Sequence, residues 1–260
     1  MGYQIAIDGP AGAGKSTIAK LLAKKKGFVY VDTGAMYRGL AYYFLSRGIQ
    51  PQEEAAIAKA CNDVSIDIAY ENGIQQIYVN HVNVTCHLRE EAVGNMASRS
   101  SGIAVVRAKL LELQRDLAEK ENVVMDGRDI GTSVLPDADL KIFLTASVDT
   151  RARRRYNELL EKGESCDYEK IASDIEERDR RDMTRDISHY VRQRNARLVD
   201  SSDMTIEEVV ETIESFCGNQ NKQTKTGKEE LPSHFGTKRV ERQRRLQLVL
   251  EGEKSVTYNK

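Results

Sequence analysis

The stretch GPAGAGKS at residues 9–16 decides the fold class of this 260-residue chain. It satisfies the phosphate-binding pattern G-x-x-x-x-G-K-[ST], and it lies between an apolar strand expected at Tyr3–Asp8 and a helix expected at about Lys15–Lys26. A Gly-rich turn that matches by chance is the alternative, expected in roughly one chain of this length in a hundred. The residues of the loop, with the one that follows it, are Gly9, Pro10, Ala11, Gly12, Ala13, Gly14, Lys15, Ser16 and Thr17.

This loop predicts binding of a nucleoside triphosphate. Glycines let the backbone wrap closely around phosphate oxygens, and the helix N-terminus adds unpaired N–H groups and the positive end of the helix dipole. We expect Lys15 to bridge the β- and γ-phosphates and the Ser16 hydroxyl to serve Mg²⁺. A phosphate-binding loop does not by itself name an activity, since GTPases, motor ATPases and small-molecule kinases all carry one.

Strand-like and helix-like segments alternate on either side of the loop, which favours an α/β fold with a mostly parallel sheet. Further strands are expected at Phe28–Val31, Val123–Asp126 and Leu140–Leu144, and further helices at Thr33–Ser46, Ala104–Ala118 and Thr205–Phe216. The segment Val64–Thr85 breaks the alternation and predicts a small antiparallel insert. Its three strands are expected at Ser65–Ala69, Ile74–Asn80 and Val82–Thr85.

Composition is that of an ordinary globular protein, with 40% hydrophobic and 30% charged residues and a net charge of −1. This balance provides no global attraction to nucleic acid or to a membrane surface. No apolar run is long enough to span a membrane, and the N-terminus has no signal-peptide pattern. None of the four cysteines belongs to a C-x-x-C pair; they are Cys61, Cys86, Cys166 and Cys217. We therefore expect a cytoplasmic protein with reduced thiols.

Composition changes after Cys217. The stretch Asn219–Lys228 is polar, and the remainder offers only a brief apolar cluster at Leu246–Leu250. We expect a folded domain over residues 1–218 and a disordered tail over 219–260, with at most one short helix at Lys238–Leu250. Basic residues in the tail also allow weak contact with nucleic acid, which is the less favoured interpretation.

Three polar clusters lie where a second ligand would bind. In the first, Asp32–Arg38, a Gly turn and a helix start follow the second strand. Arg38 falls about one turn into that helix, near the carboxyl end of the sheet, where ligands of open α/β sheets bind. The fork of a guanidinium suits a second phosphate. Taken alone, an ordinary surface arginine is the alternative.

The second cluster, Asp126–Thr132, follows another strand and places two carboxylates and the Arg128 guanidinium at the same edge. A polar turn with an internal Arg–Asp pair is the alternative. In the third, Glu177–Arg185, one helix face carries Arg178, Asp182 and Arg185 at i, i+4 and i+7. A ladder of intrahelical ion pairs is the alternative there. For the whole charge-dense run Arg151–Arg185, the alternative is a solvated helical face.

Taken together, these clusters resemble the bacterial cytidylate kinase family of P-loop nucleoside monophosphate kinases. The similarity spans roughly Tyr3–Cys217. It is carried by GPAGAGKST (9–17), DTGAMYR (32–38), NMAS (95–98) with Arg107, DGRDIGT (126–132), PDADLKIFL (136–144) and ERDRRDMTR (177–185). The resemblance implies a central parallel five-stranded sheet flanked by helices. It also implies that the β insert belongs to a CMP-binding region at about 35–100 and that a helical lid lies at about 151–167.

The resemblance also implies an activity: transfer of the γ-phosphoryl group of ATP, with Mg²⁺, to CMP or dCMP by a monomeric enzyme. By the family's pattern, cytosine is read by Ser98, Arg107 and Asp129, and the acceptor phosphate is held by Arg38, Arg128 and Arg185. Arg178 and Asp182 meet the sugar, and lid residues Arg154 and Arg155 close over the transferring phosphate. Thr33 stands where the family often has Ser, which keeps the hydroxyl. No catalytic base is expected, because the acceptor phosphate is already an oxyanion.

Two other classes fit less well. A shikimate-type kinase needs Asp-x-Asp after the second strand, where this chain has Asp32-Thr33-Gly34. An adenylate-type kinase is a further alternative within the same fold. A regulatory nucleotide switch needs a base-specificity motif such as N-K-x-D, and the sequence has none.

Overall fold

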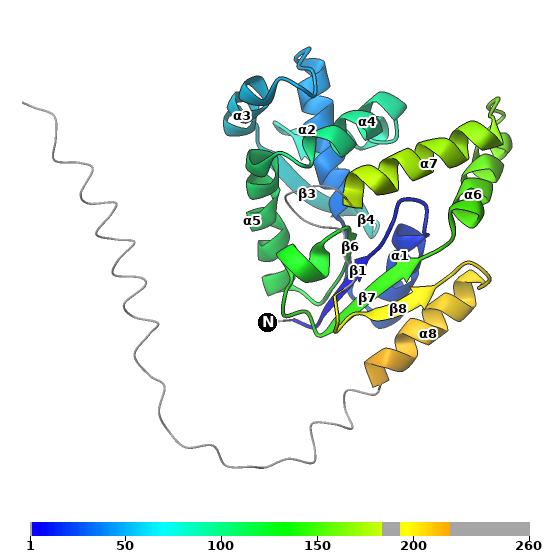
Figure 1. The fold of residues 1–260 in the computed structure, drawn as a ribbon. Helices are drawn as coiled ribbons and strands as arrows, with labels where there is room; N and C mark the ends of the chain where they lie inside the picture. Colours follow the sequence, from blue (N-terminus) through cyan, green and yellow to red (C-terminus); the bar gives the residue numbers. More distant parts are fainter. Residues whose placement is uncertain (1, 184–192, 219–260) are drawn as a thin grey trace, which may run out of the picture. The chain divides into compact units, whose positions relative to one another are not determined.

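The computed structural model describes residues 2–183 and 193–218. Within them, five parallel strands form one sheet (Figure 1). Their order across the sheet is β2 (Val29–Asp32), β6 (Val123–Gly127), β1 (Gln4–Asp8), β7 (Leu140–Thr145) and β8 (Arg197–Asp200). The register pairs Asp8 with Gly127 and Phe143, and Asp32 with Asp126. The carboxyl ends of β1, β2 and β6 therefore meet at one edge, which brings the segments that follow them together.

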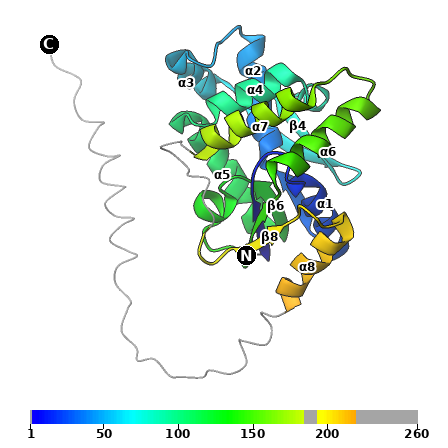
Figure 2. The ribbon, with the colours of Figure 1, turned by 45° about the vertical axis from the view of Figure 1, so that its right-hand side comes forward.

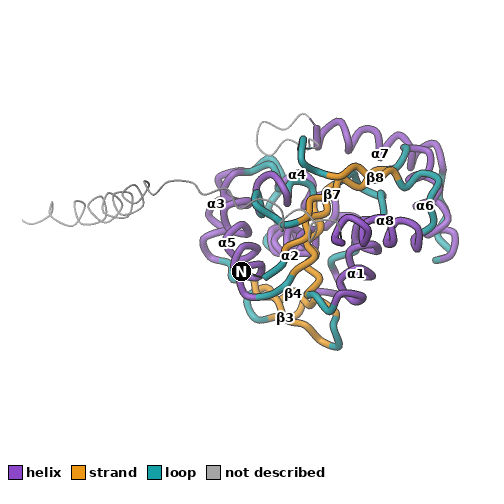
Figure 3. The backbone as a smooth tube through the Cα atoms, turned by 90° about the horizontal axis from the view of Figure 1, so that it is seen from below, coloured by secondary structure: helices purple, strands orange, loops and turns teal. Residues whose placement is uncertain are grey.

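Helices cover both faces of this sheet (Figure 3). One face packs Ile5, Ile7 and Ile142 against α1 (Lys15–Lys26) and α8 (Ile206–Gly218). The other packs Ala6 and Met125 against α2 (Thr33–Ser46) and α5 (Ala104–Lys120). Because β1 is buried on both faces, it reads as a continuous apolar run rather than an alternating one.

Local signals set the ends of the helices that carry the site. Helix α1 begins after Gly14 and ends at Gly27, both in the left-handed region that glycine tolerates. Helix α2 is capped by Asp32, whose carboxylate accepts from the Ala35 N–H at 2.8 Å. The N-terminus of α2 thus lies directly after β2 and that of α1 one loop after β1, both at the carboxyl edge of the sheet.

The predicted antiparallel insert is present as β3 (Ile66–Glu71), β4 (Ile74–Val79) and β5 (Val82–Asn83). Two-residue turns with positive φ at Asn72-Gly73 and at Asn80-His81 join its strands. The insert packs on α2 at Gly39, where a Cβ atom would lie 2.8 Å from Ile77 Cγ2. The third strand ends at Asn83 rather than at Thr85, because the chain turns there into the short 3₁₀ helix η1 (Thr85–His87).

The remaining elements are α3 (Glu54–Asp63), α4 (Glu91–Ser100), the short π-helical turn η2 (Ile130–Val134), α6 (Val148–Glu161) and α7 (Tyr168–Met183). Helix α7 lies across the carboxyl ends of the strands (Figures 1 and 2).

The α/β fold with a five-stranded parallel sheet is confirmed, although the positions of β8, α3 and α4 were not predicted. The expected tail over 219–260 lies outside the described residues. No described helix is long and apolar enough to cross a membrane.

Candidate active site

The phosphate-binding loop joins β1 to α1 and needs glycine at fixed positions. A Cβ atom at Gly9 would lie 1.9 Å from the Leu144 carbonyl oxygen, so no larger residue fits. Gly12 and Gly14 have φ angles of 77° and 86°, which other residues rarely adopt. Thr17 follows on the first turn of α1 and is exposed. The pattern of glycines in the sequence is therefore explained by backbone geometry.

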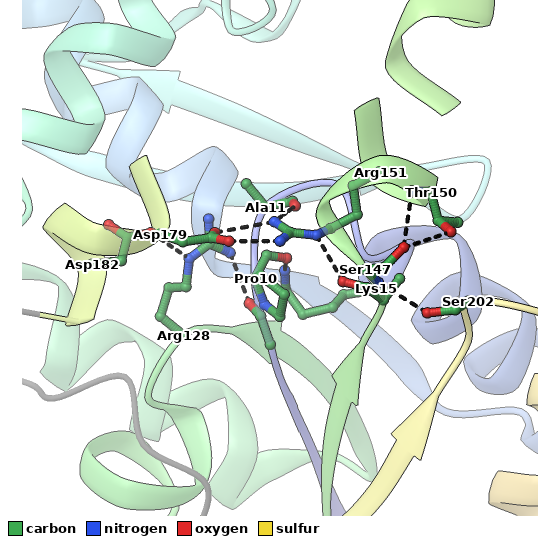
Figure 4. A network of polar contacts seen from close by, with 12 residues as sticks. Pro10, Ala11, Lys15, Arg128, Ser147, Thr150, Arg151, Asp179, Asp182 and Ser202 are labelled. Atoms are coloured by element: carbon green, nitrogen blue, oxygen red, sulfur yellow. Dashed lines mark hydrogen bonds and ion pairs between the residues drawn. The ribbon is translucent and has the colours of Figure 1, made fainter. Parts of the chain in front are cut away.

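Three cationic side chains hold three consecutive carbonyl groups of this loop (Figure 4). Arg128 Nη1 donates to the Gly9 oxygen at 3.1 Å and Lys15 Nζ to the Pro10 oxygen at 2.7 Å. Arg151 Nη1 donates to the Ala11 oxygen at 3.1 Å. These cations come from the segment after β6, from α1 and from α6, so the loop is fixed from three sides.

Ser16 faces a carboxylate that the chain supplies from β6. Its hydroxyl donates to Asp126 Oδ2 at 2.9 Å, and the Tyr30 hydroxyl donates to Asp126 Oδ1 at 2.8 Å. Burial, and then the nearby Asp32 carboxylate, raise the pKa of Asp126 to about 6. A hydroxyl beside buried carboxylate oxygens is the donor set that a hard cation takes next to nucleotide phosphates. Ser16 and Asp126 therefore fit a Mg²⁺ ion, and Asp126 is an addition to the sequence prediction.

The residues predicted to read the base come from three different segments. Arg107 on α5 forms a partly buried ion pair with Asp129, which follows β6. Arg107 Nη1 also donates to the Ser101 oxygen at 3.4 Å, at the end of the helix α4 that carries the buried Ser98. Thr33 Oγ1 donates to the Asp126 carbonyl at 2.8 Å. The structure thus joins Arg107 to Asp129, whereas Asp129 and Arg128 do not form the internal pair considered as an alternative.

Positive charge accumulates beside the loop. Burial, and then the nearby Arg128 and Arg38, lower the pKa of Arg178 to about 10 against the opposing effect of Asp182. Burial, and then Arg128, also lower the pKa of Lys15 to about 7. The Arg178 Nε atom is buried without a partner among the described residues. Cations from α1, α2, α7 and the segment after β6 therefore repel one another, which is the electrostatic signature of a site for anions.

Helix α7 is bound to the loop through two carboxylates one turn apart. Asp182 accepts from Arg128 Nε at 2.9 Å, and Asp179 accepts from Arg151 at 2.6 and 3.1 Å (Figure 4). Both pairs connect α7 to other segments, so an intrahelical ladder does not by itself account for these two acids. The solvated-face interpretation is wrong for Arg151, which is 3% exposed. The sequence signal that could have indicated its burial is its position in the first turn of α6, just after β7 and at the edge of the sheet.

The other predicted lid and phosphate residues have different surroundings. Arg154 donates to the Ser201 carbonyl at 2.7 Å, close to Gly14 of the loop. Arg155 is exposed and pairs with Glu158 on its own helix at 2.9 Å, so this structure does not bring it to the loop. Arg185 lies outside the described residues.

Comparisons with known proteins agree with this geometry. The family model described as cytidylate kinase matches residues 5–218. The chain belongs to the cytidylate kinase family. Family members are phosphotransferases, so the predictions of a kinase, of nucleotide binding and of this family are confirmed.

The match to curated cytidylate kinases covers nearly the whole length of those proteins. The protein from Caldicellulosiruptor saccharolyticus is 47% identical over 80% of this chain and 92% of its own. Those from Bacillus licheniformis and Shouchella clausii are 45% and 43% identical, over 80% and 85% of this chain and 93% and 99% of their own. Among solved structures, a gluconokinase from Sinorhizobium meliloti has a TM-score of 0.46 and 14% identity over 86% of this chain and 98% of its own, too distant to add to the cytidylate kinase assignment.

Proposed function

We propose that this cytidylate kinase transfers the γ-phosphoryl group of MgATP to CMP and dCMP, forming CDP and dCDP, through the residues described above. The observation that carries the proposal is the group of mutually repelling cations, Lys15, Arg38, Arg128 and Arg178, gathered around one loop. Two phosphate-bearing ligands would neutralise this charge, one on each side of Arg128.

The donor nucleotide binds at residues 9–17. Lys15 is held beside the loop by the Pro10 carbonyl and exchanges that contact for the β- and γ-phosphates. Ser16 and Asp126 would hold a Mg²⁺ ion, which would neutralise charge on the phosphates. Arg151 keeps the loop backbone in place during this exchange.

The acceptor binds on the side of Arg107 and Asp129. The Asp129 carboxylate accepts from the exocyclic amine of cytosine, which uracil lacks, and Arg107 donates to the ring nitrogen and carbonyl. Because the two side chains already hold each other, the pair is preorganised for one base. Ser98 completes the contact with the base. With uracil bound, the Asp129 carboxylate would face a carbonyl oxygen of the base instead of an amine, and this repulsion discriminates against uracil.

The remaining cations act on the phosphates and the sugar. Arg38, Arg128 and Arg185 hold the acceptor phosphate, and Arg178, Asp182 and Thr33 contact the rest of the nucleotide. Arg154 and Arg155 stabilise the charge that spreads over the transferring group, once the lid has moved to bring Arg155 inward. The acceptor oxygen is already anionic, so no side chain has to remove a proton. We further propose that the enzyme acts as a monomer in the cytoplasm.

A coupled assay of ADP formation tests this function. Wild-type enzyme is offered CMP, dCMP, UMP, AMP and shikimate, and the two cytidine nucleotides are expected to be phosphorylated most efficiently. Asp129→Asn is expected to lower kcat/KM for CMP about 10- to 100-fold, the cost of losing one base-reading contact, with little effect on UMP. Asp139→Asn is the matched control, because this exposed carboxylate accepts a backbone N–H from Gln4 far from the site. Equal losses for CMP and UMP would refute the role of Asp129.

A further inference from the structure

Asp8 is a buried carboxylate to which the proposed reaction assigns no part. It ends β1 and directly precedes the phosphate-binding loop. Both of its oxygens are used: Oδ1 accepts from the Ile130 N–H at 2.7 Å and Oδ2 from the Gly131 N–H at 2.8 Å. These two N–H groups follow Arg128 and Asp129 in the chain. One side chain therefore connects the strand that leads into the donor loop with the segment that carries two acceptor residues.

The contact satisfies a local need of that segment. Ile130 and Gly131 open the short turn η2, and the first N–H groups of a helical turn have no acceptor within the turn itself. Asp8 supplies both acceptors from a neighbouring strand, in the manner of a helix cap. The approach is close: a Cβ atom at Gly131 would lie 3.3 Å from Asp8 Oδ2 and 3.2 Å from Lys141 Cδ. The absence of a side chain at Gly131 thus leaves room for the Asp8 carboxylate.

The arrangement is electrostatically costly. The pKa of Asp8 is raised to about 6, chiefly by burial and also by the nearby Asp129 carboxylate, against the opposing effect of the two backbone hydrogen bonds and of Lys15. Packing alone at the end of an apolar strand would be served by an uncharged residue. A carboxylate offers two equivalent acceptors, whereas asparagine offers one acceptor and one donor. The two aligned acceptors are what the segment requires.

We propose that Asp8 is a positioning residue that sets the orientation of the segment carrying Arg128 and Asp129, and so controls acceptor binding and base choice. The inference rests on the proposed function for the identity of the acceptor, and on the geometry alone for the direction of the effect. Asp129 is followed immediately by the first N–H that Asp8 holds. Losing one of the two bonds lets this peptide rotate and displaces Asp129 from Arg107.

The test is Asp8→Asn in the full-length chain, with KM for ATP, KM for the acceptor and kcat measured at several temperatures. We expect KM for the acceptor to rise about tenfold or more, since small displacements of positioned groups carry losses of up to about 100-fold. KM for ATP should change by less than about threefold, the ordinary scale of a substitution outside the donor contacts. The preference for CMP over UMP should fall towards that of Asp129→Asn. Asp139→Asn serves again as the control.

Each outcome is decisive. Equal changes in the two KM values, or an unchanged CMP:UMP preference, would overturn the positioning role. If the variant turns over too slowly to assay, titration calorimetry with CMP and with ADP replaces kinetics, and selective loss of CMP binding is the supporting result. If wild-type enzyme prefers another monophosphate, the proposed function fails. The effect of Asp8→Asn on KM for that acceptor, compared with its effect on KM for ATP, still tests the role of Asp8.

Discussion

Replacing Asp179 by asparagine tests whether α7 is held to the phosphate-binding loop through Arg151. The Arg151 side chain is 4% exposed and forms two hydrogen bonds with Asp179, at 2.6 and 3.1 Å. It also donates to the carbonyls of Ala146 and Ala11. Breaking a buried pair by removing one partner costs about 3–5 kcal/mol, because a buried charge remains without its counter-ion. Asparagine keeps one acceptor, so we expect about 3 kcal/mol.

The assay is urea unfolding followed by circular dichroism. With an m value of about 2 kcal/mol/M, the midpoint should fall by roughly 1.5 M. Glu177→Gln is the matched control: it lies on the same helix, and its pair with Arg181 is exposed and spans 4.0 Å. That change should cost less than about 1 kcal/mol. KM for ATP should rise only in Asp179→Asn. Equal midpoints for the two variants would refute the reasoning.

Further predictions concern the loop, the folded unit, the buried acid and the insert. Lys15→Met should abolish phosphoryl transfer without lowering the thermal unfolding temperature, because burial already disfavours the charge; turnover near that of the wild type would contradict the loop assignment. A chain that ends at Gly218 should keep its activity, since the family match ends there, and an inactive truncate would contradict this. Raising the pKa of Asp8 from 3.8 to about 6 means that the folded state holds this proton more tightly. The stability of the wild type relative to Asp8→Asn should therefore fall by roughly 3 kcal/mol as pH rises from about 4 to 6, measured by urea unfolding; a flat difference would refute it. Gly39→Ala should destabilise by about 1–3 kcal/mol through contact with Ile77, whereas Gly94→Ala, with no neighbour within 4 Å, should stabilise slightly.

Much of the fold follows from local patterns. The helices at Lys15–Lys26 and Thr33–Ser46 have the predicted bounds, because glycine turns and an aspartate cap mark their ends within a few residues. The insert was likewise located from its strand pattern, and its turns are Asn72-Gly73 and Asn80-His81. Strand β8 was not located, since its four residues, RLVD, carry no clear period.

The candidate site divides along a similar line. The donor loop is one contiguous segment, so the spacing of its residues determines its chemistry. The base-reading residues Ser98, Arg107 and Asp129 were assigned through the family's pattern, because no spacing rule connects positions on α4, α5 and the segment after β6. The structure then joins Arg107 to Asp129, whereas it leaves Arg155 on an exposed face.

By itself, the sequence determined that this protein binds a nucleotide phosphate with a strand, a glycine loop and a helix, and which family it resembles. Only the tertiary structure decided which side chains meet. Ser16 finds Asp126 from 110 residues away, and Asp8 holds Ile130 from 122 residues away. Such contacts depend on the register of β1 against β6, which the local sequence of either strand does not specify. A loop is specified by neighbouring residues, whereas the charges that surround it are specified by packing between distant ones.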